Sequence, residues 1–239
     1  GVEDTAFYRD VAIVSTNEVG GDLRQPACSP EAFHEASARR LARWPFAMLA
    51  TATHDTKRGE AVRARLNVIS EVPDRWRRAV AAWARLNAGS RMLVDGSPAP
   101  DRQDEYLFYQ TVAGVWPAER LDEPVPGAAP DDLVRRLSTY MLKAVREAKR
   151  HTSWVSPNAA YEAAVYAQQV FVSEIRRAGE DRQLTPEERQ RAMQLALDHF
   201  MSHAPVNAAR ALVPAGKTLE EWARELIESK VPEAKLLLQ

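Results

Sequence analysis

Residues 46–52 read FAMLATA, and residues 53–58, directly after them, read THDTKR. A short and almost wholly apolar run is typical of a buried parallel strand and not of an alternating surface strand. In parallel α/β architectures, polar side chains at the carboxyl end of such a strand face the mouth of the active site. The stretch therefore predicts a strand over residues 46–52 that presents His54 and Asp55 at its end.

On pattern alone, the His54-Asp55 pair has two interpretations. A histidine and a carboxylate at a strand end can bind the hydroxyls of a sugar and hold a negative charge near a cationic transition state. A solvated turn or a helix cap explains the same dipeptide, because aspartate and threonine serve often as caps.

Upstream of this stretch, residues 1–28 suggest a strand and loops, with the apolar run VAIV at residues 11–14. Ser29 is a candidate helix N-cap and Pro30 then occupies the first helical position. Pro45 must end this helix, because proline cannot continue it. A helix is thus expected just before the apolar run.

Downstream, helical signals dominate from Glu60 to the end of the chain. Apolar residues recur at three- and four-residue spacing, and Trp76 and Trp83 are expected in the core. Residues 104–116 (DEYLFYQTVAGVW) predict a core helix, whereas the Gly-, Pro- and Asp-rich residues 89–101 predict a loop. Further helices are expected at residues 131–149 and 157–179 and from residues 185 and 218, with a loop at 122–130. The predicted fold class is mainly α with one or two short strands.

Composition excludes several classes of partner. The 239 residues carry 32 Lys+Arg against 33 Asp+Glu, so no electrostatic case for a nucleic acid or an anionic membrane follows. The sequence contains no run of about eighteen apolar residues, so no membrane-spanning helix is predicted. We expect a cytoplasmic protein. The single Cys28 cannot form an intrachain disulfide. His199 and His203 have helical metal-ligand spacing but no nearby carboxylate pattern, so no metal site is expected.

Residues 48–66 (MLATATHDTKRGEAVRARL) closely resemble the segment around the fourth conserved motif of the α-amylase-type glycoside hydrolase barrel, in the form particular to maltooligosyl trehalose synthases. Residues 1–9 (GVEDTAFYR) and 17–21 (NEVGG) resemble that family's segment after the sixth barrel strand. Residues 104–117 and 149–162 resemble the helical region that the family inserts between its seventh and eighth strands. Matches in one order along the chain are more specific than any single motif.

The resemblance implies roles for the residues of the THDTKR motif. Asp55 would be the third catalytic carboxylate, which grips the hydroxyls of a distorted glucosyl ring and steadies an oxocarbenium-like transition state. His54 would hydrogen-bond the same sugar. Lys57, Arg58 and Glu60 would shape the pocket that retains the cleaved glucose. Alternatively they only start the next helix, with Lys57 and Arg58 solvated and Glu60 complementing the helix dipole.

Four further residues fall within elements that resemble the family. Trp154 and Tyr161 could stack on the sugar rings of the donor chain, with burial in the core as the alternative. Asp4 and Tyr8 could line the rim of the site, or only pack the surrounding loops.

The resemblance also implies that the chain is a C-terminal fragment. A retaining mechanism needs a nucleophile and an acid/base carboxylate about 5 Å apart, and in this family both belong to strands that would precede Gly1. The family's eighth-strand segment is not found either. We expect three regions, namely a partial (β/α) barrel segment with the catalytic motif (residues 1–60), a helical insertion domain (61–172) and a helical C-terminal region beyond the resemblance (173–239).

In the whole enzyme, the resemblance implies conversion of the reducing-end α-1,4 linkage of a maltooligosaccharide into an α,α-1,1 linkage, without a cofactor or metal. The isolated chain lacks the N-terminal barrel portion of the same enzyme as its partner, and we expect it to be inactive. Its strands at residues 11–14 and 46–52 would lack parallel neighbours, which leaves exposed edges or a rearranged helical fold. The alternative function is a non-catalytic helical module that binds a glycan or a partner chain.

Overall fold

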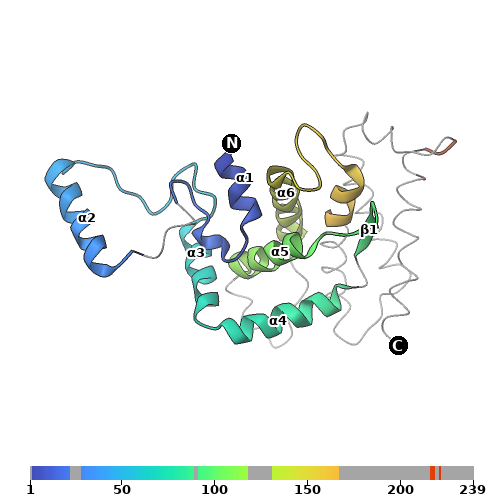
Figure 1. Ribbon diagram of the computed structural model, residues 1–239, viewed down its shortest axis with the longest axis horizontal. Helices are drawn as coiled ribbons and strands as arrows, with labels where there is room; N and C mark the ends of the chain where they lie inside the picture. Colours follow the sequence, from blue (N-terminus) through green and yellow to red (C-terminus); the bar gives the residue numbers. More distant parts are fainter. Residues whose placement is uncertain are drawn as a thin grey trace.

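The computed structural model describes residues 2–21, 28–88, 91–117, 131–166, 216–218 and 221 (Figure 1). Its elements are, in chain order, α1 (Val2–Arg9), η1 (Val14–Thr16), α2 (Pro30–Arg43), α3 (Glu60–Asn67), η2 (Val68–Ser70), α4 (Pro73–Leu86), β1 (Met92–Val94), β2 (Ser97–Ala99), α5 (Arg102–Val115) and α6 (Asp131–Ala148). Residues 159–166 are helical as well. The described part of the chain is mostly helical with one two-stranded sheet, so the mainly α prediction is confirmed.

Helix ends follow the caps that the sequence predicts. The Ser29 hydroxyl accepts a hydrogen bond from the Ala32 N–H at 3.2 Å, Pro30 is the first residue of α2, and the helix ends at Arg43 before Pro45. The Thr218 hydroxyl accepts the Glu221 N–H at 3.1 Å, as expected of a helix start there. The satisfied N-terminal amide explains why α2 begins where it does.

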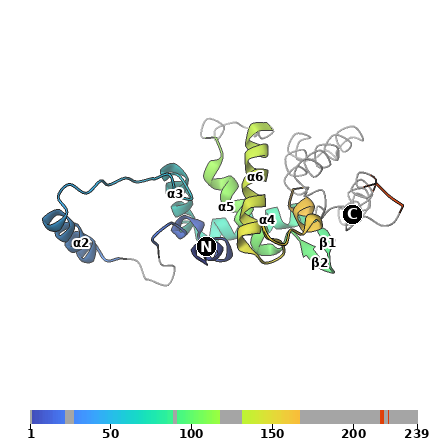
Figure 2. The ribbon, with the colours of Figure 1, turned by 90° about the horizontal axis from the view of Figure 1, so that it is seen from above.

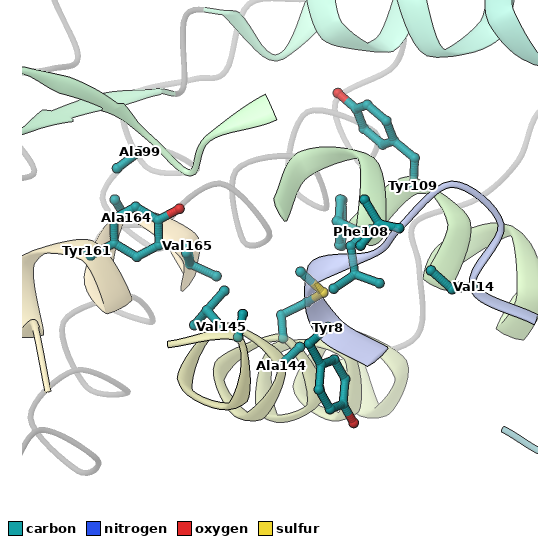
Figure 3. Packing of buried hydrophobic residues seen from close by; sticks show 14 of the residues in the cluster. Tyr8, Val14, Ala99, Phe108, Tyr109, Ala144, Val145, Tyr161, Ala164 and Val165 are labelled. Carbon is teal, nitrogen blue, oxygen red and sulfur yellow. The ribbon is translucent and has the colours of Figure 1, made fainter. Parts of the chain in front are cut away.

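The core lies between α5, α6 and the helices packed on them. α1 packs on α6, α3 packs on α5, and residues 159–166 close one end of the core (Figure 3). Fully buried side chains from distant parts of the sequence meet here, among them Val14, Leu66, Leu107, Met141 and Val165. Trp76 and Trp83 of α4 are half-buried against this cluster with their rings edge to face at 5.6 Å, so their predicted place at the core is confirmed.

The predicted strand at residues 11–14 is wrong, and residues 2–9, expected as strand or loop, form α1. Val11 and Val14 are buried, but a side chain on α5 satisfies their backbone. The Gln110 carbonyl oxygen accepts the Val14 N–H at 3.0 Å, and its amide nitrogen donates to the Val11 carbonyl at 2.7 Å. Because one buried glutamine replaces a neighbouring strand, the apolar run needs no sheet.

The predicted buried strand at residues 46–52 is also not formed. These residues are irregular and exposed, with Phe46 at 96% and Met48 at 99% exposure. α2, directly before them, buries none of its residues and lies apart from the other helices in both views (Figures 1 and 2). A parallel strand needs at least one neighbouring strand, and no described strand pairs with residues 46–52.

Residues 89–101, predicted as a loop, contain the strands β1 and β2. They pair antiparallel, with Met92 opposite Ala99 and Val94 opposite Ser97. The two-residue turn is Asp95-Gly96, with φ of 52° and 76°. Two positive φ angles define the tight hairpin turn that Asp-Gly favours. This dipeptide was the sequence signal for the hairpin.

Candidate functional site

His54 and Asp55 lie at the tip of a short turn between Thr53 and Thr56. The Thr56 hydroxyl accepts the Thr53 N–H at 2.6 Å, and the two threonine hydroxyls are 3.1 Å apart. His54 is exposed, and the Asp55 side chain is 60% exposed. The structure thus places both predicted residues on a surface turn. Hydrogen bonds between the flanking residues Thr53 and Thr56 close this turn.

Lys57 connects Asp55 to α1. Its Nζ lies 2.9 Å from Asp4 Oδ1 and 3.5 Å from Asp55 Oδ1, and its side chain is only 15% exposed. The hydrogen bond to Asp4 raises the pKa of Lys57, and the same bond lowers the pKa of Asp4. Lys57 thus bridges two carboxylates, one on α1 and one at the tip of the turn.

Arg58 is buried beneath the same turn, with 7% of its surface exposed. Its Nη2 donates to the Tyr140 hydroxyl of α6 at 2.8 Å, and its Nη1 donates to the Asn17 carbonyl at 3.5 Å. The alternative in which Lys57 and Arg58 are solvated at a helix start is therefore wrong. Glu60 is the exposed first residue of α3 and accepts a hydrogen bond from the Thr51 hydroxyl at 2.9 Å, a position that complements the helix dipole.

Tyr8 and Asp4 reach this region from α1. Tyr8 is buried with 2% exposure and packs on Tyr140 with the ring centroids 6.4 Å apart. Burial raises the pKa of its hydroxyl above the usual range. Tyr8 thus packs the base of the region, whereas Asp4 contacts the loop through Lys57.

Trp154 and Tyr161 lie in the segment after α6 and differ in access. Trp154 is 55% exposed, donates from Nε1 to Glu147 at 2.9 Å, and has the Arg146 guanidinium 4.8 Å from its ring centroid. Tyr161 is 3% exposed, and its ring stacks on His151 at 4.5 Å. Among the residues that the structure describes, no hydrogen bond or ion pair joins either aromatic residue to residues 53–58.

A partly buried ionic network surrounds Tyr161, and sequence reasoning missed it. The Arg150 guanidinium donates to both Asp101 and Asp104, His151 Nε2 lies 2.7 Å from Asp101 Oδ2, and the Tyr161 hydroxyl bonds Asp104. The signal was present as the Asp101 cap, whose carboxylate accepts two α5 amides, and as the Lys-Arg-His run at 149–151. This network fixes the start of α5 to the segment after α6.

The two carboxyl groups of the network have opposite pKa shifts. Burial raises the pKa of Asp101, but hydrogen bonds from the Asp104 N–H, His151 and Arg150 outweigh it and leave the pKa lowered. Burial and the charge of Asp101 raise the pKa of Asp104. One guanidinium between two carboxylates cannot fully balance both negative charges. This explains why the pKa values of Asp101 and Asp104 shift in opposite directions.

A second ion pair fixes the same segment to α6. Arg146 donates from Nε and Nη2 to the two oxygens of Glu162 at 2.8 and 2.6 Å, and Thr152 donates to Glu162 at 2.7 Å. The planar guanidinium suits this bidentate contact. Because Arg146 also contacts the ring of Trp154, the pair determines where the exposed tryptophan lies.

Neither a metal-ligand cluster nor a membrane-spanning helix occurs within the described residues. Residues 2–21, 28–88, 91–117 and 131–166 contain no group of three or more His, Cys, Asp or Glu residues that could hold a metal ion. In the same part of the chain, no helix combines the length and the apolarity that a bilayer crossing needs. His199 and His203 lie outside the described residues.

Comparison with known proteins identifies relatives of one kind. Solved structures similar in fold include maltooligosyl trehalose synthases. One from Sulfolobus tokodaii has a TM-score of 0.59 at 30% identity, over 84% of this chain and 23% of that chain. One from Arthrobacter ramosus has a TM-score of 0.55 at 33% identity, over 87% of this chain and 23% of that chain. The sequence matches no family model.

Curated relatives agree with the solved structures. Two proteins of Mycobacterium tuberculosis, from strains CDC 1551 and H37Rv, carry the name maltooligosyl trehalose synthase and are 44% identical over 161 residues, 67% of this chain. The chain spans 19% of the length of these relatives. It is therefore homologous to part of the maltooligosyl trehalose synthases, and the resemblance found in the sequence is confirmed.

Proposed function

We propose that this chain is part of an intramolecular transglucosylase that converts the reducing-end α-1,4 linkage of a maltooligosaccharide into an α,α-1,1 linkage. The observation that carries the proposal is the THDTKR turn, which presents Asp55 and His54 to solvent from an anchored base. The homology to maltooligosyl trehalose synthases supplies the reaction class. The expected product is a maltooligosyl trehalose, and we place the enzyme in the cytoplasm.

In this proposal, Asp55 acts as an ionised carboxylate toward the reacting glucosyl ring. Its free oxygens can accept hydrogen bonds from sugar hydroxyls, and its charge can stabilise an oxocarbenium-like transition state. His54 beside it offers a ring nitrogen to the same sugar. Lys57, 3.5 Å from the Asp55 carboxylate, limits where that side chain can lie. Carboxylates alone supply this chemistry, so the proposal needs no metal or cofactor.

Trp154 is the better candidate of the two aromatic residues for a sugar contact. Arg146 lies over its ring and Glu147 holds its indole N–H, so the exposed tryptophan has a defined orientation. A sugar ring can stack on such a surface through its apolar C–H groups. Tyr161, which is 3% exposed, would support the site through the segment that carries Trp154.

The partner in this proposal is the rest of the synthase barrel, which would supply the nucleophile and the acid/base. Its neighbouring strands would bury Phe46 and Met48, which are almost fully exposed in the chain alone. Residues 46–52 are apolar at successive positions, as in a strand that is covered on both faces. Without that partner the chain has one of the three carboxylates and is expected to be inactive.

A non-catalytic glycan-binding module is the second candidate function. The exposed, oriented Trp154 favours it, because a single aromatic platform can bind a sugar without any carboxylate chemistry. The two functions differ in their dependence on Asp55, since glycan binding at Trp154 does not require that residue.

The experiment is an Asp55→Asn substitution in the complete parent enzyme. Loss of the charge at the transition state should lower the rate of maltooligosyl trehalose formation by at least about 10²-fold. Folding should be intact, because the side chain is 60% exposed and the change preserves its size. Rates are measured as the loss of reducing ends from a maltooligosaccharide.

Asp95→Asn is the matched control, since this exposed aspartate lies in the hairpin turn, where asparagine tolerates the positive φ. It should leave the rate unchanged. An Asp55→Asn enzyme with normal turnover would refute the catalytic role of Asp55. Retained glycan binding by a wild-type enzyme without turnover would instead support the binding module.

A further inference from the structure

One carboxylate holds the main chain of the THDTKR turn. Glu18 Oε1 accepts the Lys57 N–H at 2.6 Å, and its Oε2 accepts the Arg58 N–H at 3.2 Å. Two successive amides thus point at the two oxygens of a single side chain that is 39 residues earlier in the sequence. Hydrogen bonds to an ionised acceptor are about twice as strong as neutral ones.

Glu18 is itself placed by a rigid base. Its neighbour Asn17 is 1% exposed and donates from its side chain to the Phe7 carbonyl at 2.7 Å and to the Asp10 carbonyl. The Glu18 carbonyl accepts the Gly21 N–H at 2.8 Å, which closes the following turn. The carboxylate therefore projects from a turn that is fastened to α1.

The two sides of the Asp55 turn differ in how they are held. On the N-terminal side, residues 46–52 are exposed and have no neighbouring strand in the described part of the chain, and Thr51 bonds Glu60 and Arg63 of α3 at the surface. On the C-terminal side, Glu18 holds two amides, Arg58 reaches Tyr140, and Lys57 reaches Asp4. The buried and half-buried contacts thus lie on the C-terminal side of Asp55, two to three residues after it.

We infer that Glu18 is a positioning residue for residues 53–58, and that it holds the carboxylate of Asp55 in place through the amides of Lys57 and Arg58. The catalytic consequence rests on the proposed function, whereas the positioning does not. A glutamine at this position has one oxygen in place of two, and its NH₂ group would face an N–H. Charge and acceptor number are therefore both required.

The direct test is amide hydrogen exchange in Glu18→Gln and in Glu18→Ala. Loss of a charge-assisted hydrogen bond should make the Lys57 and Arg58 amides exchange about tenfold faster or more. Amides in α5, such as that of Leu107, should keep their protection. Glu3→Gln is the matched control: its carboxylate accepts the Gly20 N–H at 3.2 Å in the same region but does not contact the turn.

Unchanged exchange at Lys57 and Arg58 in both Glu18 variants would overturn the inference. Equal loss of protection in α5 would also overturn it, because Glu18 would then support the whole fold and not the turn. Both outcomes can be measured by hydrogen exchange in a protein that has no enzymatic activity.

Kinetics of Glu18→Gln in the complete parent enzyme give the catalytic consequence. A misplaced Asp55 should lower kcat by about ten- to a hundredfold, because displacement weakens transition-state contacts more than substrate binding, and KM should change less. Normal kcat in an active wild-type background would overturn the positioning role in catalysis. Faster exchange combined with a wild type that forms no trehalose would leave the positioning intact and refute the proposed function.

Discussion

Asp101 shows how one side chain can both cap a helix and join an ionic network. It caps α5 through the amides of Gln103 and Asp104, accepts charge-assisted hydrogen bonds from Arg150, and lies 2.7 Å from His151 Nε2. Its lowered pKa means that the folded state favours the ionised form more than the unfolded state does. Its stabilising effect is therefore present above its unfolded pKa and is lost as the pH falls through its folded pKa.

We expect Asp101→Asn to lower the free energy of unfolding by about 1–3 kcal/mol at pH 7, because asparagine keeps the cap but loses the charged bonds. The difference between wild type and variant should shrink as the pH is lowered through the acid range. Urea unfolding at several pH values measures it, with the exposed Asp74→Asn as the control. A difference that stays constant with pH would show that the charge of Asp101 does not stabilise the fold.

At the scale of elements, the contact between α3 and α5 depends on a missing side chain. Gly114 of α5 is buried, and a Cβ there would lie 2.7 Å from Val62 Cγ1 and 3.4 Å from Leu66 Cγ of α3. A glycine inside a helix normally costs about 1 kcal/mol relative to alanine. The close approach of the two helices outweighs this propensity, and α3 carries the THDTKR turn at its start.

Gly114→Ala should therefore destabilise the fold by about 1–3 kcal/mol, because overpacking exceeds the gain in helix propensity. The double variant Gly114→Ala/Val62→Ala should recover part of this loss, since it removes the clashing methyl group. Thermal unfolding of the two single variants and the double variant measures the coupling. A more stable Gly114→Ala protein would mean that the helices can separate without cost.

At the scale of the whole molecule, the exposed run after α2 is the main departure from an ordinary soluble domain. Phe46 and Met48 contribute almost no burial to the described fold, although they belong to the almost wholly apolar residues 46–52. Large exposed apolar patches mark contact sites in soluble proteins. This agrees with the proposal that the rest of a synthase barrel covers them.

The double variant Phe46→Ser/Met48→Ser should change the unfolding free energy of this chain by no more than about 0.5 kcal/mol, as for other exposed positions. In the complete parent enzyme, the same change should cost about 2–5 kcal/mol per buried side chain. Val145→Ala, in the core, should destabilise both proteins. An equal effect of the double variant in both proteins would refute burial by a partner.

The sequence by itself determined the local features of this protein. Caps such as Ser29-Pro30, breakers such as Pro45 and the helical spacing of apolar residues predicted most helices, because these signals act within a few residues. The motif around His54 and Asp55 predicted the candidate site and the family. Even the missed hairpin had a local signal in Asp95-Gly96.

Only the tertiary structure decided how the apolar runs and the charged residues are used. Residues 11–14 and 46–52 are similarly apolar, yet Gln110 of α5 satisfies the first run, whereas the second has no neighbouring strand within the described residues. The contact between Glu18 and the amides after Asp55 also spans about forty residues and has no local signature. Long-range partners supply these hydrogen bonds and this burial, and a pattern within one segment carries no information about them.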